Sequence, residues 1–265
     1  MENKTKTVVS IILPNLNQAK YIKEALDSVL NQKGNFKLEV IAVDGGSTDG
    51  SVDILKEYGR EIKWISEKDR GQSDAINKGL KMAKGNILAY FNSDDLYEDG
   101  AIQTVVDFFL RNPRVKWIYG KCRIIDENGK EIRQFIKWYK HFLGRRYSYK
   151  KLLAENFIAQ PTVFFKKEVF ESAGFFDINQ HLVMDYDYWL RIGKKYPVSF
   201  IEKYLARFRF HPLSKSNMNL RRQFKEDLEV AKRYAHGNYK FSIFLHYINY
   251  IKIIFCYGIM RFLGI

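Results

Sequence analysis

Hydrophobic residues in the first hundred positions follow two alternating spacings. Near-continuous apolar runs, typical of strands buried on both faces of a sheet, are found at Thr7–Leu13, Leu38–Val43, Ile62–Ile65 and Asn86–Phe91. Between these runs, apolar residues recur at helical spacing over residues 21–30, 51–58 and 74–84. This alternation of strands and helices predicts an α/β fold with an open, mostly parallel sheet and helices on both of its faces.

The second half of the chain is less regular. Helices are predicted over residues 101–110 and 184–192, and strands over Val115–Tyr119, Cys122–Ile136, Thr162–Phe165 and Tyr204–Phe210. A turn at Glu127–Gly129 is expected to break the second of these strands. From Asn217 onward the pattern indicates helices joined near Gly237. We therefore expect a main domain over residues 1–216 and a C-terminal helical appendage over residues 217–265.

Composition narrows the classes of protein. The 265 residues are 46% hydrophobic, which excludes a mainly disordered chain. Cys122 and Cys256 lie far apart, so neither a disulfide scaffold nor a zinc finger is expected, and a reducing compartment is favoured. The polar start of the chain carries no apolar signal segment, so secretion is not expected.

Positive charge is concentrated toward the end of the chain. The formal net charge is +14, and the segment from Lys203 onward holds 12 Lys and Arg against 3 Asp and Glu. A second basic stretch lies between Lys130 and Lys151. Such a balance points to an anionic partner, which by charge alone is a nucleic acid, a phosphorylated substrate or a membrane surface.

Polar loops follow each of the early strands, where ligands bind in open α/β sheets. These loops are Pro14–Asn17, Asp44–Gly50, Asp69–Asp74 and Asn92–Asp95. None has the glycine pattern of a P-loop or of a dinucleotide site. The adjacent carboxylates Asp94 and Asp95 suit Mg²⁺ or Mn²⁺, which is typically held by one or two carboxylates together with substrate phosphates.

Several segments in this order and spacing resemble family 2 glycosyltransferases with the GT-A fold. They are SIILPNLNQAKYIKEALDSVLNQ, VIAVDGGSTDGS, DRGQSDAINKGLKMAKGNILAYFNSDD, and GFFD followed by MDYDYWLR, which together extend over roughly residues 7–216. The resemblance implies a Rossmann-like GT-A sheet. It also implies transfer of a sugar, with inversion, from a nucleotide diphosphate donor to a glycan or lipid-linked acceptor. By family frequency the donor is a UDP-sugar.

The resemblance also assigns site residues. Donor binding falls to Pro14, Asn15, Asp44, Arg70, Asp74, Asp94, Lys215 and Ser216. The acidic motif implies a divalent metal, Mn²⁺ or Mg²⁺, on Asp94 and Asp95, with His211 either a third ligand or a proton donor to phosphate. Many relatives carry Asp where this chain has Asn92, so the metal is expected to rest on the two following carboxylates.

The resemblance places the general base at Asp185, with Asp187 as the competing candidate. Residues two apart on a helix point about 200° apart, so only one of the two faces the cleft. Asp187 is therefore expected to be a structural partner of an arginine or a backbone group. Trp189 is expected in the core, and Gln160–Thr162 are expected to border the acceptor.

Residues 241–265 are strongly apolar and aromatic. A membrane span would place Lys252 near the bilayer centre, which is unfavourable. A polar stripe of Ser242, His246, Asn249 and Lys252 favours a helix lying in the membrane interface, with packing on the protein or in a dimer as the alternative. We expect a cytoplasmic enzyme bound peripherally to the inner face of the membrane.

Two other functions are weighed against this one. A nucleotidyltransferase also uses an acidic metal site, but residues 14–20 lack its glycine-rich basic loop. A basic nucleic-acid-binding protein fits the charge, but no recognition motif for RNA or DNA is present, so nucleic acid is not expected as a partner.

Overall fold

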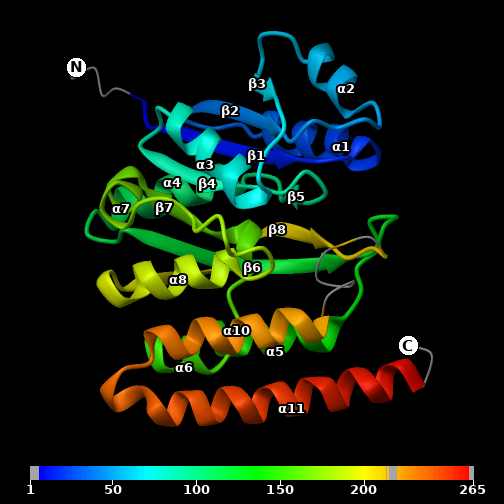
Figure 1. Ribbon diagram of the computed structural model, residues 1–265. Helices are drawn as coiled ribbons and strands as arrows, with labels where there is room; N and C mark the ends of the chain where they lie inside the picture. Colours follow the sequence, from blue (N-terminus) through cyan, green and yellow to red (C-terminus); the bar gives the residue numbers. More distant parts are fainter. Residues whose placement is uncertain (1–5, 213, 215–219, 263–265) are drawn as a thin grey trace.

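The computed structural model describes residues 6–212, 214 and 220–262, and its strands form one mixed sheet (Figure 1). The strands are β1 (Val8–Asn15), β2 (Lys37–Asp44), β3 (Lys63–Ser66), β4 (Ile87–Tyr90), β5 (Leu96–Tyr97), β6 (Trp117–Ile125), β7 (Phe164–Lys166) and β8 (Val198–Arg209). Their order is β3-β2-β1-β4-β7-β6-β8-β5. Strands β1 to β4 pair in parallel, as do β6 and β8, whereas β7 runs antiparallel to both of its neighbours. The predicted mostly parallel α/β sheet is confirmed.

Helices cover both faces of this sheet. They are α1 (Ala19–Leu30), α2 (Ser51–Glu57), α3 (Gln72–Met82), α4 (Ala101–Arg111), α5 (Gln134–Gly144), α6 (Tyr149–Ala154), α7 (Lys167–Ala173), α8 (Met184–Lys195), α10 (Leu220–Tyr234) and α11 (Lys240–Phe262), with short 3₁₀ turns η1 (Gln160–Thr162) and η2 (Gly237–Tyr239). Neighbouring strand residues point to opposite faces, so Ile11 enters the core beneath α1 and α4 whereas Ile12 enters the core beneath α3 and α8. Trp189 is fully buried and stacks on Trp117, as expected.

The predicted strand over Cys122–Ile136 is wrong in its second half. Strand β6 ends at Ile125, a single bridge joins Ile125 to Glu131, and α5 begins at Gln134. The carboxylate of Asp126 accepts hydrogen bonds from the amides of Asn128 and Lys130, which turns the chain sharply. Beyond this turn, the aromatic residues of α5 recur at helical rather than strand spacing.

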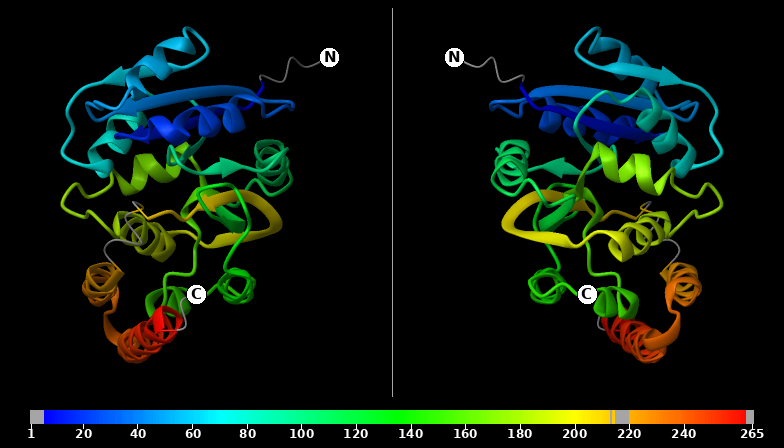
Figure 2. Two further views of the ribbon diagram at one scale, coloured as in Figure 1. Left: turned by 90° about the vertical axis from the view of Figure 1, so that its right-hand side faces the viewer. Right: turned by 90° about the vertical axis from the view of Figure 1, so that its left-hand side faces the viewer.

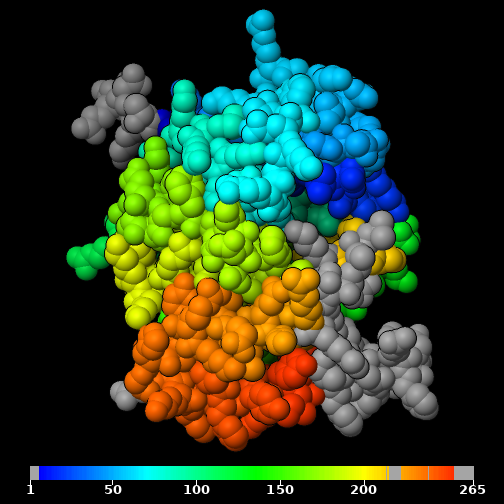
Figure 3. Space-filling model, in the orientation of Figure 1, coloured from blue at the N-terminus to red at the C-terminus, as the bar shows by residue number. Residues whose placement is uncertain are grey.

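A layer formed by α5, α6, α10 and α11 lies beyond the β6 and β8 side of the sheet (Figures 1 and 2). Helix α10 packs on α8, and α11 packs on α6 and α10. The orange and red residues of α10 and α11 cover the lower part of the face shown in Figure 3. The boundary at residue 216 stays a prediction, because it falls outside the described residues.

The polar stripe of α11 contacts the protein, with its first residues buried and Lys252 at the exposed margin. Ser242 and His246 are buried, His246 Nδ1 lies 2.9 Å from the carbonyl oxygen of Leu153, and Asn249 donates to the carbonyl of Ala154 at 3.2 Å. The ammonium of Lys252 donates to the hydroxyl of Tyr139 on α5 at 3.0 Å. The helix therefore packs through its polar side, and its apolar side is turned outward.

Exposed aromatic and aliphatic side chains gather on the outer surface of this layer. We call these residues the outer apolar face: Phe135, Trp138 and Phe142 of α5, and Phe241, Phe244, Leu245, Tyr247, Ile248 and Ile251 of α11. Trp138 stacks on Phe142 with ring centroids 5.7 Å apart, and the tilted ring of Phe135 lies 5.9 Å from Trp138 on centroids. Among the described residues, no helix combines the length and the apolar character that a bilayer crossing requires.

Candidate active site

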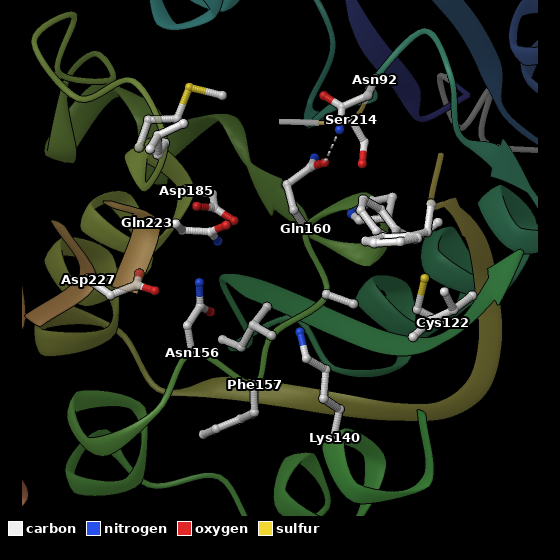
Figure 4. A pocket seen from close by; sticks show the side chains of 18 of the residues that line it. Asn92, Cys122, Lys140, Asn156, Phe157, Gln160, Asp185, Ser214, Gln223 and Asp227 are labelled. Carbon is white, nitrogen blue, oxygen red and sulfur yellow. Dashed lines mark hydrogen bonds between the residues drawn. The ribbon is translucent and has the colours of Figure 1, made fainter. Parts of the chain in front are cut away.

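One cavity of about 950 Å³ runs from the loops after β1 and β4 to the helical layer (Figure 4). Four of the predicted site residues line it: Pro14, Asn15, Asp94 and Asp185. Gln160 and Pro161, expected to border the acceptor, also line it. The carboxyl ends of the parallel strands thus meet at one cavity, as expected for an open α/β sheet.

The carboxylate of Asp44 holds the loop after β2 in place instead of lining the cavity. It is fully buried and accepts hydrogen bonds from the amides of Gly46 and Ser47 at 3.0 and 2.9 Å. The hydroxyl of Ser66 and the side-chain amide of Asn15 donate to it at 2.7 Å each. Burial alone would raise the pKa of Asp44, but these hydrogen bonds outweigh it and hold the pKa below the usual value. Asp44 therefore fixes the position of Asn15, whose own oxygen is buried without a partner among the described residues.

Asp69 lies in the cavity wall, whereas Arg70 and Asp74 are turned away from it. The carboxylate of Asp69 accepts a hydrogen bond from the amide of Gly71 at 2.8 Å. A Cβ at Gly45 would lie 2.5 Å from Oδ2 of Asp69, so a larger residue there would displace the Asp69 side chain. Arg70 is exposed, and its guanidinium lies 3.4 Å from Asp74, whose carboxylate also accepts the Arg70 amide. The predicted donor-binding loop thus reaches the cavity through Asp69, and donor binding by Arg70 and Asp74 stays a prediction.

The two carboxylates after β4 have different surroundings. Asp94 lines the cavity, and its Oδ2 lies 3.1 Å from Nε2 of His211. Asp95 is fully buried and accepts hydrogen bonds from the Arg209 amide at 2.9 Å and from the side chain of Asn92 at 3.2 Å. Burial and then the charge of Asp94 raise the pKa of Asp95 well above its usual range. The structure therefore brings Asp94 and His211 together and commits Asp95 to holding β8.

Asp94 and His211 can complete a metal site only when a substrate supplies further ligands. Within residues 6–212, 214 and 220–262, no three His, Cys, Asp or Glu side chains gather so as to hold an ion. Asp94 and His211 supply two ligand atoms, and Mg²⁺ is commonly bound by one or two protein groups plus substrate phosphates. The residues present thus suit a divalent ion that arrives with a diphosphate.

A chain of side-chain amides links the loop after β4 to the middle of the cavity. Gln72 donates to the oxygen of Asn92 at 2.7 Å, and Asn92 donates to Gln160 at 3.2 Å. Gln160 in turn donates to the carbonyl of Tyr90 at 2.8 Å. Both the oxygen and the NH₂ group of the Asn92 side chain are hydrogen-bonded within the protein. The side chain therefore holds the loop in position.

Asp185 lies in the first turn of α8 and lines the cavity. Its carboxylate accepts a hydrogen bond from the amide of Tyr186 at 2.7 Å. Burial raises the pKa of Asp185 above the usual value, and the Tyr186 amide and the positive charge of Lys140 oppose that rise only in part. A carboxylate with a raised pKa in a cavity has the properties of a general base.

Asp187 faces the opposite way, as predicted. Its carboxylate forms an ion pair with Arg191 at 3.0 Å and accepts a hydrogen bond from the hydroxyl of Tyr234 at 3.0 Å. It is 3% exposed. The predicted pairing of Asp187 with an arginine is confirmed, and the Tyr234 hydroxyl also joins it to α10.

The far end of the cavity is formed by residues that the sequence did not single out. Figure 4 shows Lys140 of α5, Asn156, and Gln223 and Asp227 of α10 around the space below Asp185. Gln223 and Asp227 are four residues apart and so share one side of α10. Lys140, Gln223 and Asp227 belong to helices and Asn156 to the loop after α6. None of them lies in a recognisable motif, so no sequence pattern could have identified them.

Two predicted donor residues cannot be placed. Lys215 and Ser216 lie outside the described residues. The neighbouring Ser214 lines the cavity, and its buried hydroxyl has no hydrogen-bond partner among the described residues.

Comparison with known families finds a match to most of the first two thirds of the chain. Residues 10–174 match the model of Glycosyl transferase family 2. An uncharacterised glycosyltransferase of Rickettsia conorii is 31% identical over 209 residues, which cover 77% of this chain and 34% of the relative. Chondroitin synthase of Escherichia coli is 28% identical over 242 residues, which cover 89% of this chain and 34% of the relative. The chain thus spans about a third of the length of both relatives.

Solved structures share the fold. A mannosyltransferase of Pyrobaculum calidifontis, in complex with GDP-Man and Mn²⁺, matches with a TM-score of 0.66 at 20% identity, over 92% of this chain and 74% of its own. S. aureus TarS 1-349 in complex with UDP-GlcNAc matches with a TM-score of 0.66 at 17% identity, over 90% of this chain and 70% of its own. The sheet and its helices are therefore those of a GT-A glycosyltransferase.

Proposed function

The chain belongs to glycosyl transferase family 2, and from this premise we propose that it moves a sugar, with inversion, from a nucleotide diphosphate donor to a hydroxyl of a glycan or lipid-linked acceptor. The observation that carries the proposal is that Asp185 and Asp94 line one cavity together with the loop after β1. A proton acceptor and a diphosphate site thus share one enclosed space. The donor we propose is a UDP-sugar.

Asp185 acts as the general base in this proposal. Its carboxylate accepts the proton of the acceptor hydroxyl as that hydroxyl attacks the anomeric carbon, while the bond to the nucleotide diphosphate breaks. Direct attack inverts the anomeric centre and requires no covalent sugar intermediate. The raised pKa of Asp185 supports this role, because a stronger base takes the proton more readily.

Asp94 and His211 are the groups we propose for a divalent ion that accompanies the donor. Such an ion, Mn²⁺ or Mg²⁺, neutralises charge on the leaving diphosphate. Asp44 and Asn15 shape the nucleoside end of the cavity, and Asp69, rather than Arg70 or Asp74, is the charged residue of its loop that lines it. Asp95 keeps Arg209 and hence β8 against the loop that bears Asp94.

We further propose that the outer apolar face binds an anionic membrane surface, which keeps the protein at the inner face of the membrane. Large exposed apolar patches mark interaction surfaces, and nine aromatic or aliphatic side chains are exposed there. The exposed cations Arg145 and Arg146 follow α5 directly, Lys150 and Lys151 lie in the first turn of α6, and Lys240 begins α11. Apolar side chains rimmed by cations suit an interface with anionic head groups better than a polar protein surface.

Donor binding and product stereochemistry test the catalytic proposal. The protein is titrated with UDP-GlcNAc and with GDP-Man, each with and without MnCl₂, and the anomeric configuration of the transferred sugar is read by proton NMR. Metal-dependent binding of one donor and an inverted product support the proposal. Binding of neither, or a retained configuration, contradicts it.

A further inference from the structure

The end of the cavity below Asp185 contains buried polar atoms that no described residue satisfies. Asp227 is 4% exposed, and its Oδ1 has no hydrogen-bond partner among the described residues. The side-chain oxygen of Asn156 is likewise buried without one. Buried polar groups in proteins are nearly always hydrogen-bonded, and an unpaired one is unfavourable for folding. Two such atoms at one cavity end indicate a place where a ligand supplies the missing partners.

Lys140 forms no ion pair with the carboxylates of Asp185 and Asp227 among the described residues. Figure 4 shows its side chain rising from α5 into the same space. Its charge nevertheless lowers the pKa of both carboxylates. The cation therefore acts across the cavity, and the space between the three side chains is open to a ligand.

Asp227 lies close to the general base. Burial raises the pKa of Asp227 well above its usual range, and the charge of Asp185 raises it further. The two side chains point into the cavity from different helices, α8 and α10 (Figure 4). A molecule that presents a hydroxyl to Asp185 from the helical layer must pass Asp227 and Asn156.

We propose that Asp227 and Asn156, with Gln223 beside them, form a binding subsite for the acceptor, and that the acceptor group held there is a sugar ring with free hydroxyls. This proposal rests on the proposed glycosyl transfer. A carboxyl and two carboxamides offer both acceptors and donors, which matches neighbouring hydroxyls of a sugar. The carboxyl of Asp227 is the group that holds the ring in place while Asp185 takes the proton of the attacking hydroxyl.

Acceptor kinetics of the full chain test this subsite. The probes are p-nitrophenyl glycosides of glucose, galactose and N-acetylglucosamine, with the nucleotide sugar that binds as donor and product measured by mass spectrometry. Asp227→Asn should raise the acceptor KM by about threefold to tenfold, because an oxygen that accepts a hydrogen bond from a sugar hydroxyl is replaced by an NH₂ group that can only donate. Its Kd for the donor should stay that of the wild type. Asn156→Ser should raise the acceptor KM in the same direction.

Glu229→Gln is the matched control. Glu229 lies on the same helix, is exposed, and pairs with Lys232 at 2.9 Å away from the cavity. The same change from acid to amide should leave its acceptor KM at the wild-type value. Because Asp227 is buried with a raised pKa, Asp227→Asn should also keep the thermal midpoint at or above that of the wild type.

The outcomes separate the two proposals. If the wild type binds no nucleotide sugar, the proposed glycosyl transfer fails. If the donor binds and is consumed but no glycoside in the panel is an acceptor, the sugar subsite is overturned. It is overturned as well if Asp227→Asn keeps the wild-type acceptor KM, or if it only lowers the thermal midpoint, which would make Asp227 a structural residue.

Discussion

Asp185 and Asp187 stand two positions apart at the start of α8 and serve opposite sides of the helix. Asp185 faces the cavity, whereas Asp187 is paired with Arg191 and Tyr234 between α8 and α10. The pairing of Asp187 holds α10 against α8, and α10 carries Asp227 into the far end of the cavity. Helix α8 thus presents the base, Asp185, on one side. On its other side, Asp187 holds α10, which forms part of the cavity wall.

Asp187→Ala should therefore destabilise the protein. It leaves the Arg191 guanidinium and the Tyr234 hydroxyl without their buried partner, a loss of about 1–3 kcal/mol in the free energy of unfolding. Urea denaturation measures the change. Asp53→Ala, which removes an exposed carboxylate paired with Lys56, is the control and should change stability little. Equal stability of the two variants would show that Asp187 does not fasten α10.

The surroundings of Asp185 give its activity a specific pH dependence. A base works only when deprotonated, so the rate should fall as the pH drops through the pKa of Asp185, which burial places above the ordinary Asp value of about 3.9. The charge of Lys140 lowers that pKa, so Lys140→Gln should move the acidic limb of the pH–rate profile to higher pH. Lys151→Gln, on the exposed side of α6, should leave the limb in place. A limb that does not move in Lys140→Gln would contradict the coupling.

The two carboxylates after β4 should differ in their effect on metal-dependent donor binding. Asp94→Ala removes the cavity-facing oxygens, so the gain in donor affinity on adding MnCl₂ should disappear. Asp95→Asn keeps an oxygen for the Arg209 amide and should retain most of that gain. Calorimetry of donor binding with and without MnCl₂ measures both. Loss of the MnCl₂-dependent gain in Asp95→Asn but not in Asp94→Ala would show that Asp95, and not Asp94, binds the metal.

The outer apolar face should control binding to anionic vesicles. Replacing Phe135, Trp138 and Phe142 together by Ser should weaken binding to phosphatidylglycerol vesicles by more than about tenfold. Burial of each aromatic side chain in the bilayer contributes about 1.5–3 kcal/mol to the binding free energy. Leu110→Ser, which removes an exposed apolar residue of α4, should have no such effect. Vesicle flotation measures the bound fraction. Unchanged flotation of the triple variant would contradict the membrane proposal.

Much of the sheet could be predicted because its first half has clean periodicity. The strands at Thr7–Leu13 and Leu38–Val43 are buried on both faces, so their apolar runs are unmistakable. The segment after Ile125 was predicted wrongly because aromatic and β-branched residues at 132–138 suit a strand and a helix alike, and the Asp126 turn decides between them.

The site was predictable as a set of loops but not always as individual residues. Asp44 and Asp95 have the residue types of ligands, but partners distant in the sequence, Ser66 and Arg209, occupy their carboxylates. Lys140 and Asp227 reach the cavity only because α5 and α10 fold over the edge of the sheet. Such positions depend on tertiary packing, which a local pattern does not encode.

The most direct test of the central claim is the rate of sugar transfer by Asp185→Asn under saturating donor. The account predicts a donor Kd equal to that of the wild type and a kcat lower by about 10²–10⁴-fold, because the variant cannot accept the acceptor proton. Asp187→Asn, assayed at a temperature where it is folded, should keep a kcat near that of the wild type. Wild-type turnover by Asp185→Asn, or loss of turnover in Asp187→Asn alone, would contradict the assignment of Asp185 as the base.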